Sequence, residues 1–241
     1  MLLLDNPVVP MGFEFTFQPK VSLTRRKADK YILRKLEQGL EAKLDKLGNL
    51  GFYPDFGNLE VNSPVFTKTE AILKYYSALW ELVKDDFVVK LDDWTGGGCH
   101  IHANCNEAFA LKVQKVLYHN HYLSWAFNDP YDDINACPLP YADELNTYNK
   151  AYLVRFAGRQ LKGNTTIEFR FFDNPNSLEE LVAYVKTVNT IFAMAKTGKY
   201  PKDGPVNAYI KSFEAFKKTA NIKFSNERLL GRLELEGVSH A

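Results

Sequence analysis

The segment Thr166-Ile-Glu-Phe-Arg-Phe171 alternates between polar and apolar side chains. Successive side chains of a β-strand point to opposite faces, so this pattern predicts a strand with one polar and one apolar face. Thr166, Glu168 and Arg170 would lie together on the polar face. A glutamate and an arginine two residues apart on one face can interact with each other or with a common ligand.

Three further segments show the same alternation: 12–17, 59–62 and 99–104. Their polar faces would carry Glu14 and Thr16, then Glu60 and Asn62, then His100, His102 and Asn104. A solvent-exposed strand face usually favours Thr, Lys, Gln and Ser, whereas these faces concentrate Glu, His and Arg. The apolar faces need a cover of helices, because a sheet must bury its hydrophobic side. We therefore expect an α+β fold, with helices on one face of an antiparallel sheet and an open polar face on the other.

Amphipathic helices are predicted between and after these strands. Their ranges are about 33–47, 67–82, 106–117, 177–197, 206–216 and 225–236. The second and fourth begin with capping boxes, Thr67-Lys-Thr-Glu70 and Ser177-Leu-Glu-Glu180. The first ends at Gly48 and the fourth at Gly198, since glycine commonly terminates helices. We expect residues 1–200 to form the main domain and 201–241 a helical extension packed on it.

Composition excludes several classes of protein. The 241 residues carry 30 Lys and Arg against 29 Asp and Glu, and this net charge of +1 argues against a nucleic-acid coat or a membrane-surface protein. Hydrophobic residues at 46% and charged residues at 24% are typical of a folded globular chain. The N-terminus does not resemble a signal peptide, no apolar run is long enough to span a membrane, and the three cysteines suit a reducing cytoplasm.

Four polar side chains suggest a metal site. Glu14, Glu60, His100 and Glu168 come from separate strands, and a shared sheet would bring them onto one surface. Close carboxylates repel one another, and a divalent cation commonly relieves the repulsion. Oxygen ligands with one imidazole suit Mg²⁺ or Mn²⁺ better than zinc.

Arginines near these strands add a second kind of chemistry. The guanidinium groups of Arg155, Arg159 and Arg170 could each bind two oxygens of a phosphate group. Enzymes that transfer phosphoryl groups commonly combine a metal ion with such arginines. A plainer interpretation stays open, because an outward glutamate on one strand is usually only solvated. Glu168 and Arg170 would then be a surface pair worth ~0–1 kcal/mol.

Three other features leave alternatives. Gly96-Gly-Gly98 is either a tight turn or a place where a ligand approaches the backbone. Zinc binding by Cys99 with the two histidines is disfavoured, because Cys99 and His100 point to opposite faces of a strand. The irregular segment 128–149 is a candidate lid.

Taken in order, the segments Gly12-Phe-Glu14, Leu59-Glu-Val-Asn-Ser-Pro64, Gly97-Gly-Cys-His-Ile-His102 and Thr166-Ile-Glu-Phe-Arg170 resemble the amidoligase family. This family belongs to the glutamine-synthetase-like carboxylate–amine ligases and is frequent in bacteriophages and bacteria. The resemblance extends from about residue 10 to 195. The spacing of Asn149-Lys150, Arg155 and Ile167-Glu-Phe-Arg170 is also similar to glutamine synthetase itself.

The resemblance implies a role for each matching residue. Divalent metals would be bound by Glu14, Glu60, His100 and Glu168. His102 and Asn104 would lie by the nucleotide, and Lys150, Arg155 and Arg170 would contact phosphates and the acyl substrate. The implied activity joins a small-molecule or peptide carboxylate to an amine, with ATP and Mg²⁺ or Mn²⁺, through an acyl phosphate. Arg155, Arg170 and Glu168 would be the catalytic residues.

Two departures from the family pattern keep other functions open. Thr16 replaces a second glutamate of the first strand, which removes one metal carboxylate, and Lys150 replaces an arginine. A catalytically degenerate binding or virion-associated protein on the same fold is the first alternative. Another metal-dependent phosphoryl-transfer or hydrolytic enzyme is the second. The assembly state stays open, because the apolar faces of the terminal helices could meet the core or another copy.

Overall fold

The computed structural model of the chain describes residues 5–88, 98–127, 139, 142–148, 152–161, 164–198, 208–235 and 237. Within these residues seven strands form one sheet in the order β2-β3-β1-β5-β7-β6, with β4 pairing β1 outside this path. The strands are β1 (Met11–Pro19), β2 (Gly51–Asp55), β3 (Asn58–Asn62), β4 (Phe87–Val88), β5 (Cys99–Asn104), β6 (Val154–Leu161) and β7 (Asn164–Phe172). Every pairing is antiparallel.

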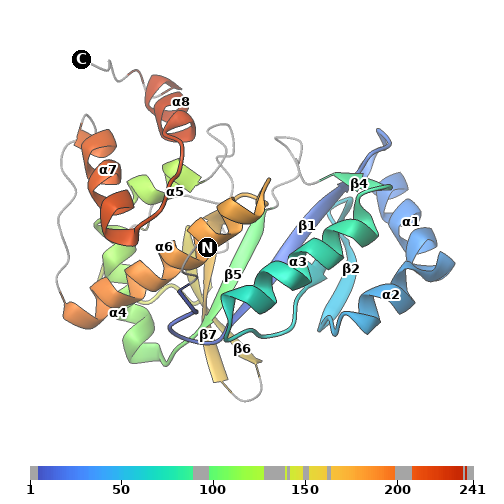
Figure 1. Ribbon diagram of the computed structural model, residues 1–241, viewed down its shortest axis with the longest axis horizontal. Helices are drawn as coiled ribbons and strands as arrows, with labels where there is room; N and C mark the ends of the chain where they lie inside the picture. Colours follow the sequence, from blue (N-terminus) through green and yellow to red (C-terminus); the bar gives the residue numbers. More distant parts are fainter. Residues whose placement is uncertain are drawn as a thin grey trace.

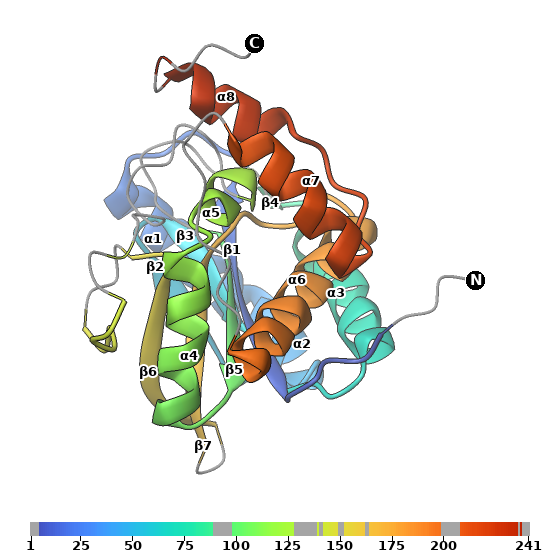
Figure 2. The same ribbon diagram turned by 90° about the vertical axis from the view of Figure 1, so that its left-hand side faces the viewer.

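Helices cover one face of this sheet (Figures 1 and 2). They are α1 (Arg25–Lys35), the π-helical turn η1 (Leu36–Leu40), α2 (Glu41–Lys46), α3 (Thr69–Val83), α4 (Glu107–Tyr118), α5 (Tyr122–Phe127), α6 (Leu178–Thr197), α7 (Tyr209–Ala220) and α8 (Glu227–Leu235). α3 and α6 lie over one face of the sheet, α4 packs beside α6, and α1 packs against β2 and β3. The predicted α+β class with one antiparallel sheet is confirmed.

The apolar faces predicted from alternation form the core. Phe13, Phe15, Val61, Ile101 and Phe169 are all buried beneath the helices. The helices contribute apolar side chains of their own to this core, as Val113, Val116 and Leu117 of α4 do. Since one-faced burial fixes which side of each strand turns inward, the polar side chains of all four predicted strands are left together on the other face.

The N-terminus of α6 agrees with its predicted capping box, whereas that of α3 does not. The backbone N–H of Glu180 donates to Ser177 Oγ at 3.1 Å, and α6 ends at Gly198 with φ of 65°. α3 has Lys68 at its N-cap without a side-chain cap. The hydroxyl of Thr69 donates instead to the carbonyl of Asp5 at 2.7 Å, so contact with the N-terminal segment takes the place of the capping box.

The predicted helix over 33–47 is interrupted. Gly39 has φ of 111°, a conformation that glycine tolerates, and it separates α1 from α2 through the π-helical turn. The interruption changes which side chains face the core. Ile32 and Leu44 are fully buried, whereas Leu33 is 47% exposed.

The C-terminal helices pack on the same core as the sheet. Phe213 of α7 and Leu229 of α8 belong to the main hydrophobic cluster. Arg228 Nη2 lies 3.2 Å from Asp173 Oδ2 and 3.3 Å from Glu180 Oε1, which ties α8 to the junction of β7 and α6. The expected domain boundary at residue 200 lies outside the described residues. Of the helices in the described ranges, none is both sufficiently long and sufficiently apolar to cross a membrane.

A β-bulge interrupts the pairing of β5 with β7. Cys99 is opposite Phe172 and Ile101 is opposite Phe169, so two residues of β7 stand beside His100 alone. Immediately before this bulge the backbones approach closely at Gly98. A Cβ added there would lie 2.5 Å from the carbonyl oxygen of Phe172. The close approach of the two strands therefore explains why a glycine occupies position 98, the last residue of the glycine run.

Replacing Gly98 by alanine should therefore destabilise the protein, because its methyl group would push β5 away from β7. We expect a loss of about 2 kcal/mol in the free energy of unfolding, measured by urea denaturation. Gly51→Ala is the matched control, since the nearest atom to its added Cβ is Asn62 Nδ2 at 3.9 Å. Equal stability of the two variants would contradict the prediction.

Candidate metal centre

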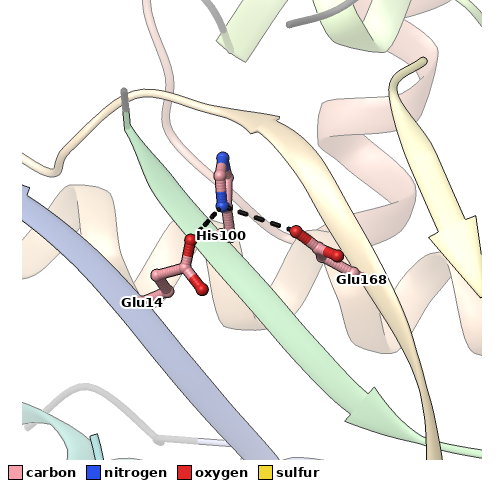
Figure 3. A group of neighbouring side chains, drawn as sticks. All are labelled: Glu14, His100 and Glu168. Atoms are coloured by element: carbon pink, nitrogen blue, oxygen red, sulfur yellow. Dashed lines mark hydrogen bonds and ion pairs between the residues drawn. The ribbon is translucent and has the colours of Figure 1, made fainter. Parts of the chain in front are cut away.

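The strand order places three of the predicted polar residues side by side. Glu14 of β1 is directly opposite His100 of β5, and Glu168 lies on β7, the other neighbour of β5. One ring nitrogen of His100 points between the two carboxylates (Figure 3). His100 Nδ1 lies 2.7 Å from Glu14 Oε1 and 3.5 Å from Glu168 Oε1. Potential ligand atoms of the three residues all lie within 4.8 Å of one another.

Glu168 also binds two guanidinium groups. Arg155 Nε donates to Glu168 Oε2 at 2.8 Å, and Nη2 of the same arginine donates to the same oxygen. Arg170 Nη1 donates to Glu168 Oε1. Glu168 is only 1% exposed, so these arginines compensate a carboxylate that is almost fully removed from water. Glu168 and Arg170 thus do form a pair, and it is buried instead of lying on the surface.

The cationic surroundings keep both carboxyl groups ionised. Burial by itself raises the pKa of Glu14, but the charge and hydrogen bond of His100, helped by His102, lower it well below its ordinary value. Burial likewise raises the pKa of Glu168, yet the charges of two histidines and two arginines bring it down to about 2. Two ionised carboxylates are therefore available at neutral pH.

Glu60, the fourth predicted ligand, is held apart from this group. The hydroxyl of Tyr53 donates to Glu60 Oε1, and Asn62 Nδ2 donates to the same oxygen at 3.1 Å. Burial and the nearby charge of Glu14 raise the pKa of Glu60. Burial and the hydrogen bond to Glu60 raise the pKa of Tyr53 to about 12. In strand pairing Glu60 faces Thr16, the position where the resemblance leads one to expect a carboxylate.

The role of Tyr53 is missed by the sequence analysis. Tyr53 lies on β2, directly opposite Glu60, and β2 carries no polar–apolar alternation in Gly51-Phe-Tyr-Pro-Asp55. Pro54 within it also weakens any strand prediction. The short spacing to Glu60 across Gly57, a turn residue with φ of 87°, is the signal that could have indicated a hairpin.

The residues expected near a nucleotide are only partly described. His102 lies on the same face as His100, with Nε2 3.7 Å from Glu14 Oε2. Asn104 follows at the end of β5, opposite Thr166. Lys150 and the side chain of Arg159 lie outside the described residues, as does most of the candidate lid 128–149.

Neither Cys99 nor Cys105, the two cysteines among the described residues, belongs to the group. Cys99 is fully buried in the hydrophobic core on the opposite face of β5, where burial raises the pKa of its thiol. This confirms that Cys99 and His100 point apart. The donor set in the described residues is thus two carboxylates and an imidazole, which fits Mg²⁺ or Mn²⁺, and the buried Nε2 of His102, without a hydrogen-bond partner there, adds an unused donor beside it.

The lowered pKa of Glu168 predicts a pH-dependent contribution to stability. The pKa of Glu168 in the folded protein, about 2, lies below its ordinary value of 4.5. The ionised carboxylate therefore contributes its full stabilisation above about pH 4.5, and this stabilisation is lost as the pH falls towards 2. The stability advantage of the wild type over Glu168→Gln should therefore shrink between about pH 5 and pH 2, measured by urea unfolding. An advantage that does not change with pH would contradict this assignment.

Comparison with known proteins gives a relationship at the level of the fold. No protein-family model matches the chain, and no curated protein sequence matches it. Among solved structures, a protein described as a novel glutamine synthase homolog superposes with a TM-score of 0.54 at 13% sequence identity. The match covers 96% of this chain and 68% of the other. The chain therefore has a glutamine synthetase-like fold, and at this identity the likeness shows the fold alone.

Proposed function

We propose that the protein is an ATP-dependent carboxylate–amine ligase of the amidoligase type. The observation that carries the proposal is the group of Glu14, His100 and Glu168, which lies beside Arg155 and Arg170 on a glutamine synthetase-like sheet. Carboxylates, an imidazole and guanidinium groups are the components that metal-assisted phosphoryl transfer uses. The residue pattern of the four strands supports the same class.

The metal would be held by Glu14, His100 and Glu168, while Glu60 stays with Tyr53 and Asn62 outside this group. When bound, Mg²⁺ or Mn²⁺ supplies charge neutralisation for the phosphates of ATP. The arginines on Glu168 leave this use open at Oε1, because that oxygen has two lone pairs and can accept from Arg170 while it ligates, whereas Oε2 already accepts two hydrogen bonds from Arg155. Arg155 and Arg170 also hold the carboxylate in a fixed orientation.

In the proposed reaction, the substrate carboxylate attacks the γ-phosphorus of ATP, giving an acyl phosphate and ADP. The amine then attacks the acyl carbon, and inorganic phosphate leaves as the amide forms. Arg155 and Arg170 would stabilise the transferring and leaving oxyanions, because a planar guanidinium binds two oxygens at once. His102, Asn104, Lys150 and Arg159 would bind the nucleotide. The carboxylate and amine substrates would be small molecules or peptides.

A catalytically degenerate binding protein is the second candidate, and one observation favours it. Thr16 faces Glu60 where a second carboxylate would complete the metal set. Glu60 binds Tyr53 and Asn62, and both oxygens of Glu168 already accept hydrogen bonds from arginines. The carboxylates therefore already have partners within the protein, and the network that they form could persist without a ligand.

Calorimetric titration with ATP separates the two candidates. A ligase should bind ATP in the presence of Mg²⁺ or Mn²⁺ and lose at least about tenfold in affinity when the metal is chelated, since the metal bridges protein and phosphate. A degenerate protein should show no binding under either condition. Equal affinity with and without metal would contradict the proposed role of the carboxylates.

Replacing Glu168 by glutamine should abolish ATP turnover, because it removes a charged ligand and the anchor of both arginines. Turnover is measured as phosphate release with added carboxylate and amine, and circular dichroism checks that the variant is folded. Glu179→Gln, an exposed substitution in the first turn of α6, is the control and should keep full activity. Turnover like that of the wild type in folded Glu168→Gln would exclude the mechanism.

A further inference from the structure

The imidazole of His102 has an unused donor atom next to the metal group. His102 is 6% exposed, and within the described residues its Nε2 is buried without a hydrogen-bond partner. Glu14 Oε2 lies 3.7 Å from this nitrogen, too far for a hydrogen bond. Because buried polar atoms are almost always partnered, an unpartnered ring nitrogen facing a carboxylate marks a place where a ligand is missing.

The sheet gives both histidines the same pair of carboxylate neighbours. His100 and His102 lie two residues apart on one face of β5. Glu14 is opposite His100 in the pairing with β1, and Glu168 is opposite His102 in the pairing with β7. The two oxygens of Glu14 divide between the imidazoles, with Oε1 near His100 and Oε2 near His102.

The surroundings of His102 Nδ1 allow the other ring nitrogen, Nε2, to bind a metal. His102 Nδ1 lies 3.5 Å from the hydroxyl oxygen of Thr166 on β7. With the proton on Nδ1 directed to this hydroxyl, Nε2 carries the lone pair that a metal ligand requires. Thr166 is fully buried, so its position beside the ring is set by the sheet.

We propose that His102 is a direct metal ligand, which makes the centre a site of two imidazoles and two carboxylates. This differs from the nucleotide-contacting role that the family resemblance implies, and it rests on the metal-binding part of the proposed function. An imidazole nitrogen binds a first-row transition metal such as Mn²⁺ more readily than it binds Mg²⁺, which prefers an octahedron of oxygens. The centre should therefore select Mn²⁺ over Mg²⁺.

Electron paramagnetic resonance of the wild-type protein loaded with Mn²⁺ tests the ligand set without any substitution. Hyperfine coupling to nitrogen should reveal two inequivalent imidazoles, one from each histidine. Calorimetry with Mn²⁺ and with Mg²⁺ alone should give a preference for Mn²⁺ of at least about tenfold. One coupled imidazole, or equal affinity for the two cations, would overturn the proposal.

Substitution of His102 tests whether this residue supplies the second imidazole. His102→Ala should weaken Mn²⁺ binding by at least about tenfold, leave Mg²⁺ binding nearly unchanged, and reduce the spectrum to one imidazole. His119→Ala, at the C-cap of α4, is the control and should behave as the wild type. His102→Asn repeats the test with a polar side chain should the alanine variant be poorly folded.

The outcomes separate this proposal from the proposed function. If His102→Ala lowers only the affinity for ATP and leaves Mn²⁺ binding intact, His102 contacts the nucleotide and the ligand assignment is wrong, while the ligase proposal stands. If Mn²⁺ binds through two imidazoles and ATP does not bind at all, the ligand assignment holds and the ligase proposal fails. An absence of Mn²⁺ binding would remove both.

Discussion

The carboxylate of Glu168 is the charge on which the polar face depends. It is removed from water at the centre of β7, and guanidinium groups from β6 and from its own strand compensate it. A buried carboxylate without such partners would be neutral or strongly destabilising. Its compensation lets one sheet face hold several charged side chains close together. The Arg155–Glu168 pair joins β6 to β7, and β7 lies directly beside β5, the strand that carries the histidines.

Period-two alternation was enough to predict four of the strands and the side chains on each face. Glu14, His100 and Glu168 followed from it, because a residue's face depends only on its own strand. Strand order and register depend on contacts between distant segments, and these decided that Glu60 stands apart. β2 was not predicted, because it contains Pro54 and its side chains do not alternate between polar and apolar. Gly39 likewise showed its effect only in the folded backbone, where it interrupts a stripe of leucines.

The contacts of the candidate centre also show why residue types alone leave its chemistry undecided. Glutamate and arginine on one face can be a ligand set for metal and phosphate, or they can satisfy one another. Here they do satisfy one another in part, since both oxygens of Glu168 accept from arginine. Within the described residues, Nε2 of His102 is the atom of this network that has no hydrogen-bond partner. A site with one unsatisfied donor is easier to explain by an external ligand than by packing.

The extra residue that β7 carries beside His100 has a consequence for both faces of the sheet. In a regular strand successive side chains point to opposite faces, yet Phe171 and Phe172 are both buried in the core. Arg170, the residue immediately before them, keeps its guanidinium group on Glu168 at the polar face. The bulge therefore lets β7 supply two consecutive aromatic rings to the core without withdrawing the arginine from the carboxylate.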